Sequence, residues 1–237
     1  FSGGDVIPTM VGDVDGSNAG PQPAARVNYH TNLSGLLAST VFQARAGQAS
    51  VVSLVDKSAD EIKTLAQSEV SFRYSLKALN PFAIAGAPGL YVPFNAEGEL
   101  DLYKPLNTAR PGLTKHSISA RSSFLGALIQ YNKSDGVGGA QGVNGYYSDQ
   151  RLGITLGLNA GGRQRCVFAS DSNSQAVIGF DRNDYLFGGA GDDPMTGNAG
   201  NDYLEGGKGD DTYLYNSGDG LDTILDSDGR GSIQMNG

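Results

Sequence analysis

Near the C-terminal end of the sequence, four aspartates recur at a spacing of nine residues, and carboxylates at a fixed period are candidate metal ligands. They are Asp184, Asp193, Asp202 and Asp211. Each lies in a glycine-rich stretch, where exposed backbone carbonyls offer further oxygen atoms. Calcium takes about six to eight oxygen ligands and accepts both carboxylates and carbonyls. The pattern therefore favours calcium binding.

These aspartates belong to a repeated nonapeptide, G-G-x-G-x-D-x-U-x, in which U is a large apolar residue. The frame is clearest in three consecutive units, 188–196, 197–205 and 206–214. Large apolar residues keep the same spacing, and those at the U position are Leu186, Met195, Leu204 and Tyr213. A disordered Gly/Asp-rich linker is the alternative interpretation, but such a linker has no reason to keep apolar residues in register.

Degenerate units flank the clear ones. The unit 179–187 lacks the fourth-position glycine, and 170–178 has Gln175 where the aspartate belongs. After a slip of two residues, the unit 217–225 carries Asp222 in frame. A last decayed unit starts at residue 226, with Gly231 in place of the aspartate and Ile233 at the apolar position.

The physical role of each position predicts how the segment folds. The glycines allow tight turns, and the x-U-x triplet predicts a short strand whose U side chain points into a narrow core. One unit buries almost no surface alone, so the units must stack. Stacked aspartates repel one another unless a cation lies between them. We therefore expect the segment to be largely disordered without calcium and to gain folding free energy from metal binding.

This pattern resembles the calcium-binding repeats of the repeats-in-toxin family, which bacteria secrete through type I systems. The resemblance covers about residues 170–233 and is clearest over 179–225. It implies a right-handed parallel β-roll in which each nonapeptide makes half a coil and calcium lies between units n and n+2. It also implies a secreted, extracellular protein that folds on calcium and binds about two to three ions.

In that family, the earlier unit of a pair gives the carbonyls of its second and fourth residues and its aspartate. The later unit gives the carbonyls of its first and third residues and its aspartate. Carried onto this chain, the first ligand set is Phe180, Arg182 and Asp184 with Gly197, Ala199 and Asp202. The second set is Gly189, Gly191 and Asp193 with Gly206, Lys208 and Asp211. The third set is Asn198, Gly200 and Asp202 with Asp222.

Three residues depart from the family pattern. Arg182 replaces a turn glycine, and Pro194 lacks the N–H that a strand ladder uses. Gln175 removes a charge from any site that it would share with the unit at 188.

Upstream, residues 1–169 predict a mixed helical body, so the fold class expected is α+β followed by the β-roll of 170–237. Ser58 and Glu61 form a capping-box pattern at the start of a helix. A second helical face ends at Asn80-Pro81, because proline disfavours a helical residue before it. The helices expected are 33–46, one from about 59, one through Phe72, Leu76 and Leu79, and one over 117–131.

The remaining body predicts short strands and loops. Residues 51–55 form a candidate buried strand, and 81–116 is expected to be irregular with a brief strand near 100–103. Residues 134–148 predict a glycine-rich loop. Residues 152–158 and 165–169 predict a hairpin-like pair of strands.

Parts of the body also resemble the region between hydrolase and repeats in large secreted class 3 lipase-like proteins. The residues that carry this resemblance are 51–67, 73–82 and 98–103. The chain has no G-x-S-x-G, so the resemblance implies a lipase-linked segment with an upstream hydrolase domain as a partner. Two alternatives stay open. Asp5 and His30 could be the acid and base of a residual hydrolase site, or the repeats could serve as an adhesin or surface-layer spacer.

Charge and hydropathy narrow the partners. The net charge is −8, but residues 170–237 hold 13 acidic against three basic residues. An acidic segment repels phosphate backbones and attracts divalent cations, so we expect no nucleic-acid partner. No apolar run approaches the roughly 18 residues of a membrane-spanning helix, so no transmembrane segment is expected.

Overall fold

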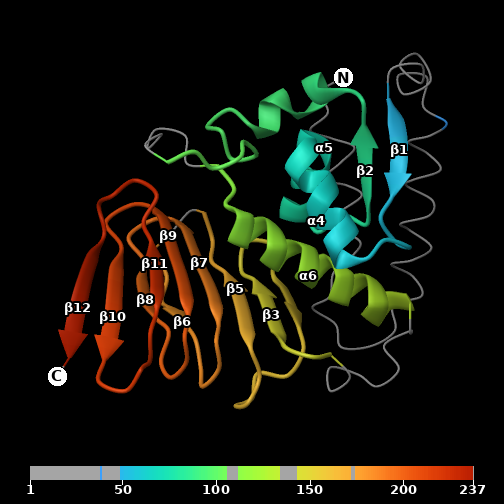
Figure 1. The fold of residues 1–237 in the computed structure, drawn as a ribbon. Coiled ribbons are helices and arrows are strands. Elements are labelled where there is room, and N and C mark those ends of the chain that lie inside the picture. The colour runs from blue at the N-terminus through green and yellow to red at the C-terminus, as the bar shows by residue number, and fades with distance from the viewer. Residues whose placement is uncertain (1–37, 39–48, 106–111, 134–142, 172–173, 237) are drawn as a thin grey trace. The chain divides into compact units, whose positions relative to one another are not determined.

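The fold is taken from a computed structural model, in which residues 38, 49–105, 112–133, 143–171 and 174–236 are described. They form two compact units (Figure 1). The first contains the described residues up to 102 together with 112–133. The second contains 103–105 and the described residues from 143 onward, and so includes residues that the sequence assigns to the body.

The first unit consists of helices and one small sheet. Its elements are β1 (Ser50–Ser53), α4 (Ala59–Ser68), α5 (Val70–Lys77), β2 (Phe82–Ala85), the 3₁₀ helix η1 (Pro88–Phe94) and α6 (Lys115–Lys133). Strands β1 and β2 pair antiparallel, with Ser50 opposite Ala85. The capping box at the start of α4 is confirmed, because Ser58 Oγ accepts from the Glu61 N–H and the Glu61 carboxylate accepts from the Ser58 N–H.

Burial in the first unit follows the predicted helical faces. Ile62 and Ala66 of α4 are fully buried. The residues predicted to face inward from α6 are also buried: Ile118, Phe124, Leu125, Leu128 and Ile129. The local amphipathic pattern therefore identified α4 and α6 and their buried faces.

Three details of this unit differ from the sequence prediction. Helix α5 ends at Lys77, before the Asn80-Pro81 stop, and Leu79 adopts a positive φ of 52° that takes the chain out of the helix. The sequence reading missed β2, which is buried at all four positions. Strand β1 is partly exposed, whereas a buried strand was predicted. The predicted helix 33–46 lies outside the described residues except for Ala38, which is helical.

The second unit is a solenoid of about five turns made from two sheets. From β5 onward, successive strands alternate between the sheets, so strands two apart in sequence are neighbours in space. One sheet has the order β12-β10-β8-β6, and the other has the order β11-β9-β7-β5-β3-β4. The strands are β3 (Tyr146–Asp149), β4 (Ile154–Leu156), β5 (Arg165–Phe168), β6 (Val177–Ile178), β7 (Tyr185–Ala190), β8 (Pro194–Thr196), β9 (Tyr203–Lys208), β10 (Thr212–Asn216), β11 (Thr223–Leu225) and β12 (Ser232–Asn236).

From β5 to β12 every pairing is parallel, as the predicted β-roll requires. Tyr185 lies opposite Tyr203, which is a register of 18 residues or two nonapeptides. Each nonapeptide therefore makes half a coil. The two-residue slip lengthens the register to 20 residues in the last coil, where Tyr203 lies opposite Thr223.

The predicted hairpin of 152–158 with 165–169 is wrong. Strand β4 pairs antiparallel with β3, and β5 pairs in parallel with both β3 and β7. Strand β3 lies partly in the stretch that was predicted to be a loop. After β4 the chain reverses, so β5 runs parallel to β3 and pairs with it instead of with β4. Strand β5 therefore adds to the solenoid and does not close a hairpin.

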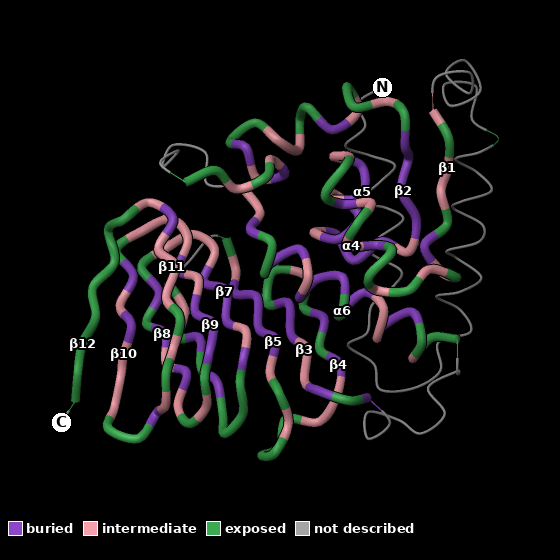
Figure 2. Tube along the Cα trace, in the orientation of Figure 1, coloured by how far each residue is buried: buried purple, intermediate pink, exposed green. Residues whose placement is uncertain are grey.

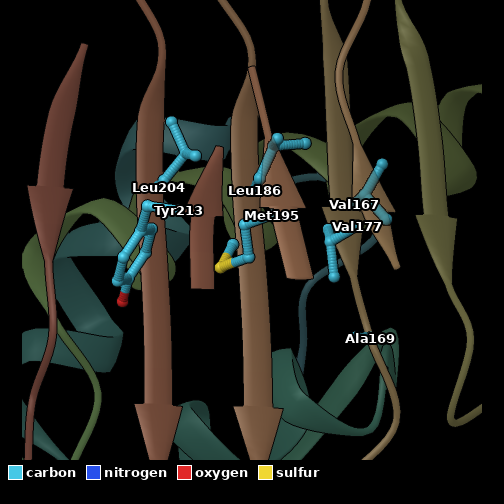
Figure 3. Close-up of a cluster of buried hydrophobic side chains, with 7 residues drawn as sticks. All are labelled: Val167, Ala169, Val177, Leu186, Met195, Leu204 and Tyr213. Carbon is cyan, nitrogen blue, oxygen red and sulfur yellow. The ribbon is translucent and has the colours of Figure 1, made fainter. Parts of the chain in front are cut away.

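Apolar side chains from both sheets fill the space between them (Figure 3). Leu186, Met195, Leu204 and Tyr213, the four residues at the U position, are each at most 2% exposed. Val167, Ala169 and Val177 belong to the same cluster. Burial falls toward the last strand, since β12 is exposed along its length (Figure 2). Ile233, at the U position of the last unit, is 61% exposed at that sheet edge.

Candidate metal sites

The repeated aspartates occupy equivalent buried places, each directly before a strand of the roll. Asp184 precedes β7, Asp193 precedes β8, Asp202 precedes β9 and Asp211 precedes β10. None is more than 2% exposed. A buried carboxylate is costly unless it is paired or binds a metal, so the partners of these four groups decide what the turns can do.

One carboxylate oxygen of each aspartate bonds to the preceding coil. Asp202 Oδ1 accepts from the backbone N–H of Asp184 at 2.7 Å, and Asp211 Oδ1 accepts from that of Asp193 at 2.9 Å. Asp222 repeats the contact with the Asp202 N–H at 3.0 Å. At the start of the roll, where no earlier aspartate exists, the N–H donors are those of Arg165 and Gln175. These bonds hold each carboxylate in the same orientation.

The second oxygen, Oδ2, faces the following coil. A Cβ built on Gly188 would lie 2.8 Å from Asp193 Oδ2 and 2.6 Å from the carbonyl oxygen of Gly206, two units later. Gly179 stands in the same relation to Asp184 Oδ2 and the Gly197 carbonyl. The carboxylate of one unit and the first carbonyl of the unit after next therefore converge on one place.

At three of the aspartates this second oxygen has no hydrogen-bond partner. The Oδ2 atoms of Asp193, Asp202 and Asp211 are buried and unpartnered, whereas Asp184 Oδ2 accepts from the Phe180 N–H at 2.6 Å. An unsatisfied charged oxygen in a buried position costs about 1–3 kcal/mol or more. Three such oxygen atoms on successive units are suitable ligands for cations.

Glycine permits the close approach of the coils. Gly207 has a φ of 110°, and a Cβ there would lie 2.1 Å from the Gly189 carbonyl oxygen. Gly209 has a φ of 132°, and its Cβ would lie 2.2 Å from the carbonyl oxygen of Gly191. Carbonyls of the earlier unit are thus packed against glycines of the later one, and a side chain would fill this place.

Burial also shifts the titration of the aspartates. Burial first, and nearby carboxylates in addition, raise the pKa of Asp202 to about 7 and that of Asp211 to about 6. The pKa values of Asp184, Asp193 and Asp222 are raised from the same first cause. Hydrogen bonds from backbone N–H groups act in the opposite direction but do not offset burial. The charged forms are therefore unfavourable without a cation.

The structure brings together parts of each predicted ligand set. In the first set, the Arg182 carbonyl lies against Gly200, and the Gly197 carbonyl lies against Gly179. In the second set, the Gly189, Gly191 and Gly206 carbonyls lie at the coil contacts given above, and the Lys208 carbonyl accepts from the Gly191 N–H. Phe180 is 41% exposed, and Ala199 lies at a bend before β9.

The third predicted set keeps the same arrangement across the two-residue slip. The Gly200 carbonyl lies 1.8 Å from the place of a Gly220 Cβ, and Asn198 takes a positive φ of 63°. Asp219 Oδ2 holds the turn that absorbs the slip, because it accepts from the N–H and the side-chain amide of Asn216. Asp222 is therefore placed opposite Asp202 as Asp202 is placed opposite Asp184.

One departure from the repeat pattern, Pro194, has a local explanation. Pro194 is the first residue of β8, where a strand tolerates proline. Arg165 lies beside Asp184 at the start of the roll, and its guanidinium carbon is 5.0 Å from the ring centres of both Tyr146 and Phe180. A fixed positive charge thus faces the first carboxylate, a contact that the sequence analysis missed.

The fifth position of the repeat has a role that the sequence analysis also missed. The side chains at this position, Asp192, Asn201 and Asp210, are exposed. They also form a ladder: Asp192 Oδ1 accepts from the Asp210 N–H at 2.8 Å, and Asn183 Oδ1 accepts from the Asn201 N–H at 2.9 Å. The recurrence of Asn and Asp at this position was the available signal.

Side-chain ligands alone do not make a site. Among the residues that the structure describes, no three His, Cys, Asp or Glu side chains cluster as a metal site requires. A cation here would also take the backbone carbonyls at the turns. Within the same part of the chain, no helix is long and apolar enough to cross a membrane. Asp5 and His30, the alternative acid and base, lie outside the described residues.

Comparison with known proteins supports the repeats and leaves the body unassigned. Residues 178–213 match the family model for the RTX calcium-binding nonapeptide repeat, in four copies. No curated protein and no solved structure matches the chain. The resemblance of 51–103 to the flank of secreted lipases has no support from these comparisons. The repeats span β6 to the start of β10, which is the stretch that contains the unpartnered carboxylates.

Proposed function

We propose that the RTX repeat segment, which binds calcium and folds as a β-roll, is a calcium-dependent folding module whose ions lie between units n and n+2, that is, between adjacent coils. The observation that supports it is the set of three buried, unpartnered Oδ2 atoms at Asp193, Asp202 and Asp211. Each faces the next coil, where a cation would meet carbonyl oxygens as well. Calcium suits such a set because it accepts about six to eight oxygens with flexible geometry.

The proposed ligands are the three predicted sets, and they make about two to three sites. Asp184 and Asp202 would hold one ion, Asp193 and Asp211 a second, and Asp202 and Asp222 a third. The turn carbonyls named above complete each set. Asp202 would serve two ions, since its Oδ1 faces the earlier coil and its Oδ2 faces the later one.

Calcium would decide whether the roll is folded. Without the ion, a folded roll holds buried carboxylates whose raised pKa values record their unfavourable charge. The solenoid has a narrow core, one apolar side chain per half coil, to oppose this cost. Metal binding therefore supplies folding free energy, and coils should form together because each one contacts only its neighbours.

Far-ultraviolet circular dichroism of the full 237-residue chain tests this function. In EGTA, we expect the signal of the roll to be that of a disordered segment, and strand signal should appear as free calcium rises to millimolar. Magnesium should substitute poorly, because it demands a small octahedral shell and retains its water. A spectrum that does not change between EGTA and millimolar calcium would contradict the proposal.

We further propose that the module belongs to a secreted bacterial protein and folds outside the cell, where calcium is plentiful. The resemblance of the repeats to secreted toxins supports this proposal. The resemblance of 51–67, 73–82 and 98–103 to lipase-like proteins supports an upstream hydrolase domain as partner. A G-x-S-x-G upstream in the full gene is the expected observation, and an adhesin-like parent without one would overturn the lipase assignment.

A further inference from the structure

The last unit of the repeat exchanges the residues of two positions. In the units that start at residues 179, 188, 197 and 206, glycine stands at position one and aspartate at position six. In the unit that starts at residue 226, Asp226 stands at position one and Gly231 at position six. By the consensus pattern of the repeat, this unit lacks the aspartate that would bind calcium.

In space, the exchange keeps a carboxylate in the same place. A Cβ on Gly206 would lie 2.1 Å from Asp211 Oδ2, the carboxylate of its own unit. A Cβ on Gly231 would lie 2.1 Å from Asp226 Oδ2. Position one and position six thus approach each other equally closely in both units. The carboxylate fills the gap between them whichever of the two positions it comes from.

Asp211 points toward this last coil. The Oδ1 atom of Asp211 bonds to the earlier coil, through the Asp193 N–H, so Oδ2 is the oxygen that faces the coil after it. Asp211 is 1% exposed, and its Oδ2 has no hydrogen-bond partner. The equivalent atoms of Asp193 and Asp202 face predicted ion sites, whereas Asp211 Oδ2 faces a coil to which the sequence assigns none.

The Tyr213 hydroxyl lies at the same place. It accepts from the Gly206 N–H at 3.1 Å and lies 3.1 Å from Asp226 Oδ2, to which it donates. It would lie 2.2 Å from a Cβ on Gly206, next to Asp211 Oδ2. The same two coils are also joined by the Gly207 carbonyl, which accepts from the Ser227 hydroxyl at 2.7 Å. The oxygens come from both coils, as in the sites upstream.

We propose that the unit at 206 and the unit at 226 hold a further calcium ion, with Asp211 Oδ2 and the Asp226 carboxylate as its acidic ligands. This inference extends the proposed function and rests on it. Because the exchange keeps a carboxylate in place, the last unit can still supply a ligand, although it lies outside residues 178–213, which match the repeat family. Asp211, like Asp202, then serves two ions.

The hydrogen bond from the Tyr213 hydroxyl to Asp226 is the alternative to an ion at this place. This bond could close the coil with no ion present. That arrangement leaves Asp211 Oδ2 unpartnered beside a second carboxylate, which is why the observations favour a cation. The two arrangements differ in the number of ions bound, and that number can be measured.

Calorimetric calcium titration of the full chain, with total bound calcium measured after equilibrium dialysis, tests the site. We expect Asp226→Asn to bind one ion fewer than the wild-type chain. Asp210→Asn is the matched control, because it removes the same charge from the unit at 206 at an exposed ion pair with Arg230 and should bind the wild-type number. The double variant Asp226→Gly/Gly231→Asp restores the consensus order and should recover the lost ion. Gly231 does not require a positive φ.

Unchanged stoichiometry in Asp226→Asn would overturn the site and favour closure by the Tyr213 hydroxyl. A loss that the double variant does not recover would also overturn it, because the carboxylate would then be needed at position one for another reason. If the wild-type chain bound no calcium, the proposed function itself would fail. If it bound calcium and Asp226→Asn bound as much, only this further site would fail.

Discussion

Asp202 is the residue at which the proposed ion sites can be tested most sharply. The residue is 2% exposed, and its two carboxylate oxygens have different surroundings. Oδ1 accepts from the Asp184 N–H at 2.7 Å, and Oδ2 is buried and has no hydrogen-bond partner. Replacing it with alanine removes one ligand from each of two ions and also leaves a buried N–H without an acceptor.

The magnitude follows from these losses. A buried group left without its charged partner costs about 1–3 kcal/mol, and about 1.4 kcal/mol corresponds to a tenfold change. Asp202→Ala should therefore raise the calcium midpoint of folding by roughly 5- to 100-fold. Asp202→Asn keeps an oxygen that can accept from Asp184, so it should lie between Asp202→Ala and the wild-type chain. The difference between the two variants separates the hydrogen bond from the ligand charge.

Asp210→Ala is the control for this comparison. Asp210 is exposed, and its ion pair with Arg230 is of the surface kind that contributes about 0–1 kcal/mol. Its calcium midpoint should stay near that of the wild-type chain. Tyrosine fluorescence can follow the titration, because Tyr185, Tyr203 and Tyr213 lie in the roll. Equal midpoints for Asp202→Ala and Asp210→Ala would refute the ligand assignment.

Three further predictions follow from the roll and the helical unit. Because burial raises the pKa of Asp202 to about 7 and that of Asp211 to about 6, protonation at lower pH stabilises the folded, metal-free roll. Lowering the pH from about 8 to about 5 should therefore increase the strand content in EGTA, as measured by circular dichroism. The same change should raise the calcium midpoint of folding. Gly207→Ala should raise the calcium midpoint far more than Gly218→Ala, since both have positive φ but only the first meets a backbone carbonyl. Ser58→Ala should destabilise α4 by about 1 kcal/mol in thermal unfolding without changing the number of ions bound, and an altered stoichiometry would contradict the separate roles.

Features that depend on nearby residues or on a fixed period could be predicted from the sequence. The Ser58 capping box involves residues three apart, so its pattern is visible directly. The apolar positions of the roll follow the repeat, and Leu186 and Met195 are fully buried as their period predicts. The stacking of the units followed from the same period, because each unit had to stack on another to bury anything, whereas the parallel β-roll was implied by the resemblance to the repeats-in-toxin family.

Features that depend on pairing across a long loop could not be predicted in this way. Strand β2 is a four-residue apolar segment without alternation, and its partner β1 lies about thirty residues earlier. Strand β5 looked like half of a hairpin because β4 precedes it closely, but its partners are β3 and β7. Neither pairing leaves a local signal.

The carboxylate of Asp226 was missed for a different reason. A consensus assigns a role to a position in the chain, and position six of the last unit is Gly231. In the folded turn, positions one and six adjoin, so an exchange between them preserves the carboxylate in space. The contact of Arg165 with Asp184 is another case, since it joins residues that belong to different coils.

Anomalous X-ray scattering from crystals grown with calcium would test the central claim most directly. The account predicts calcium peaks between units n and n+2. Each peak should lie beside one carboxylate pair: Asp184 with Asp202, Asp193 with Asp211, or Asp202 with Asp222. Protein crystallised with calcium and folded as described, but with no peak at these pairs, would contradict the account.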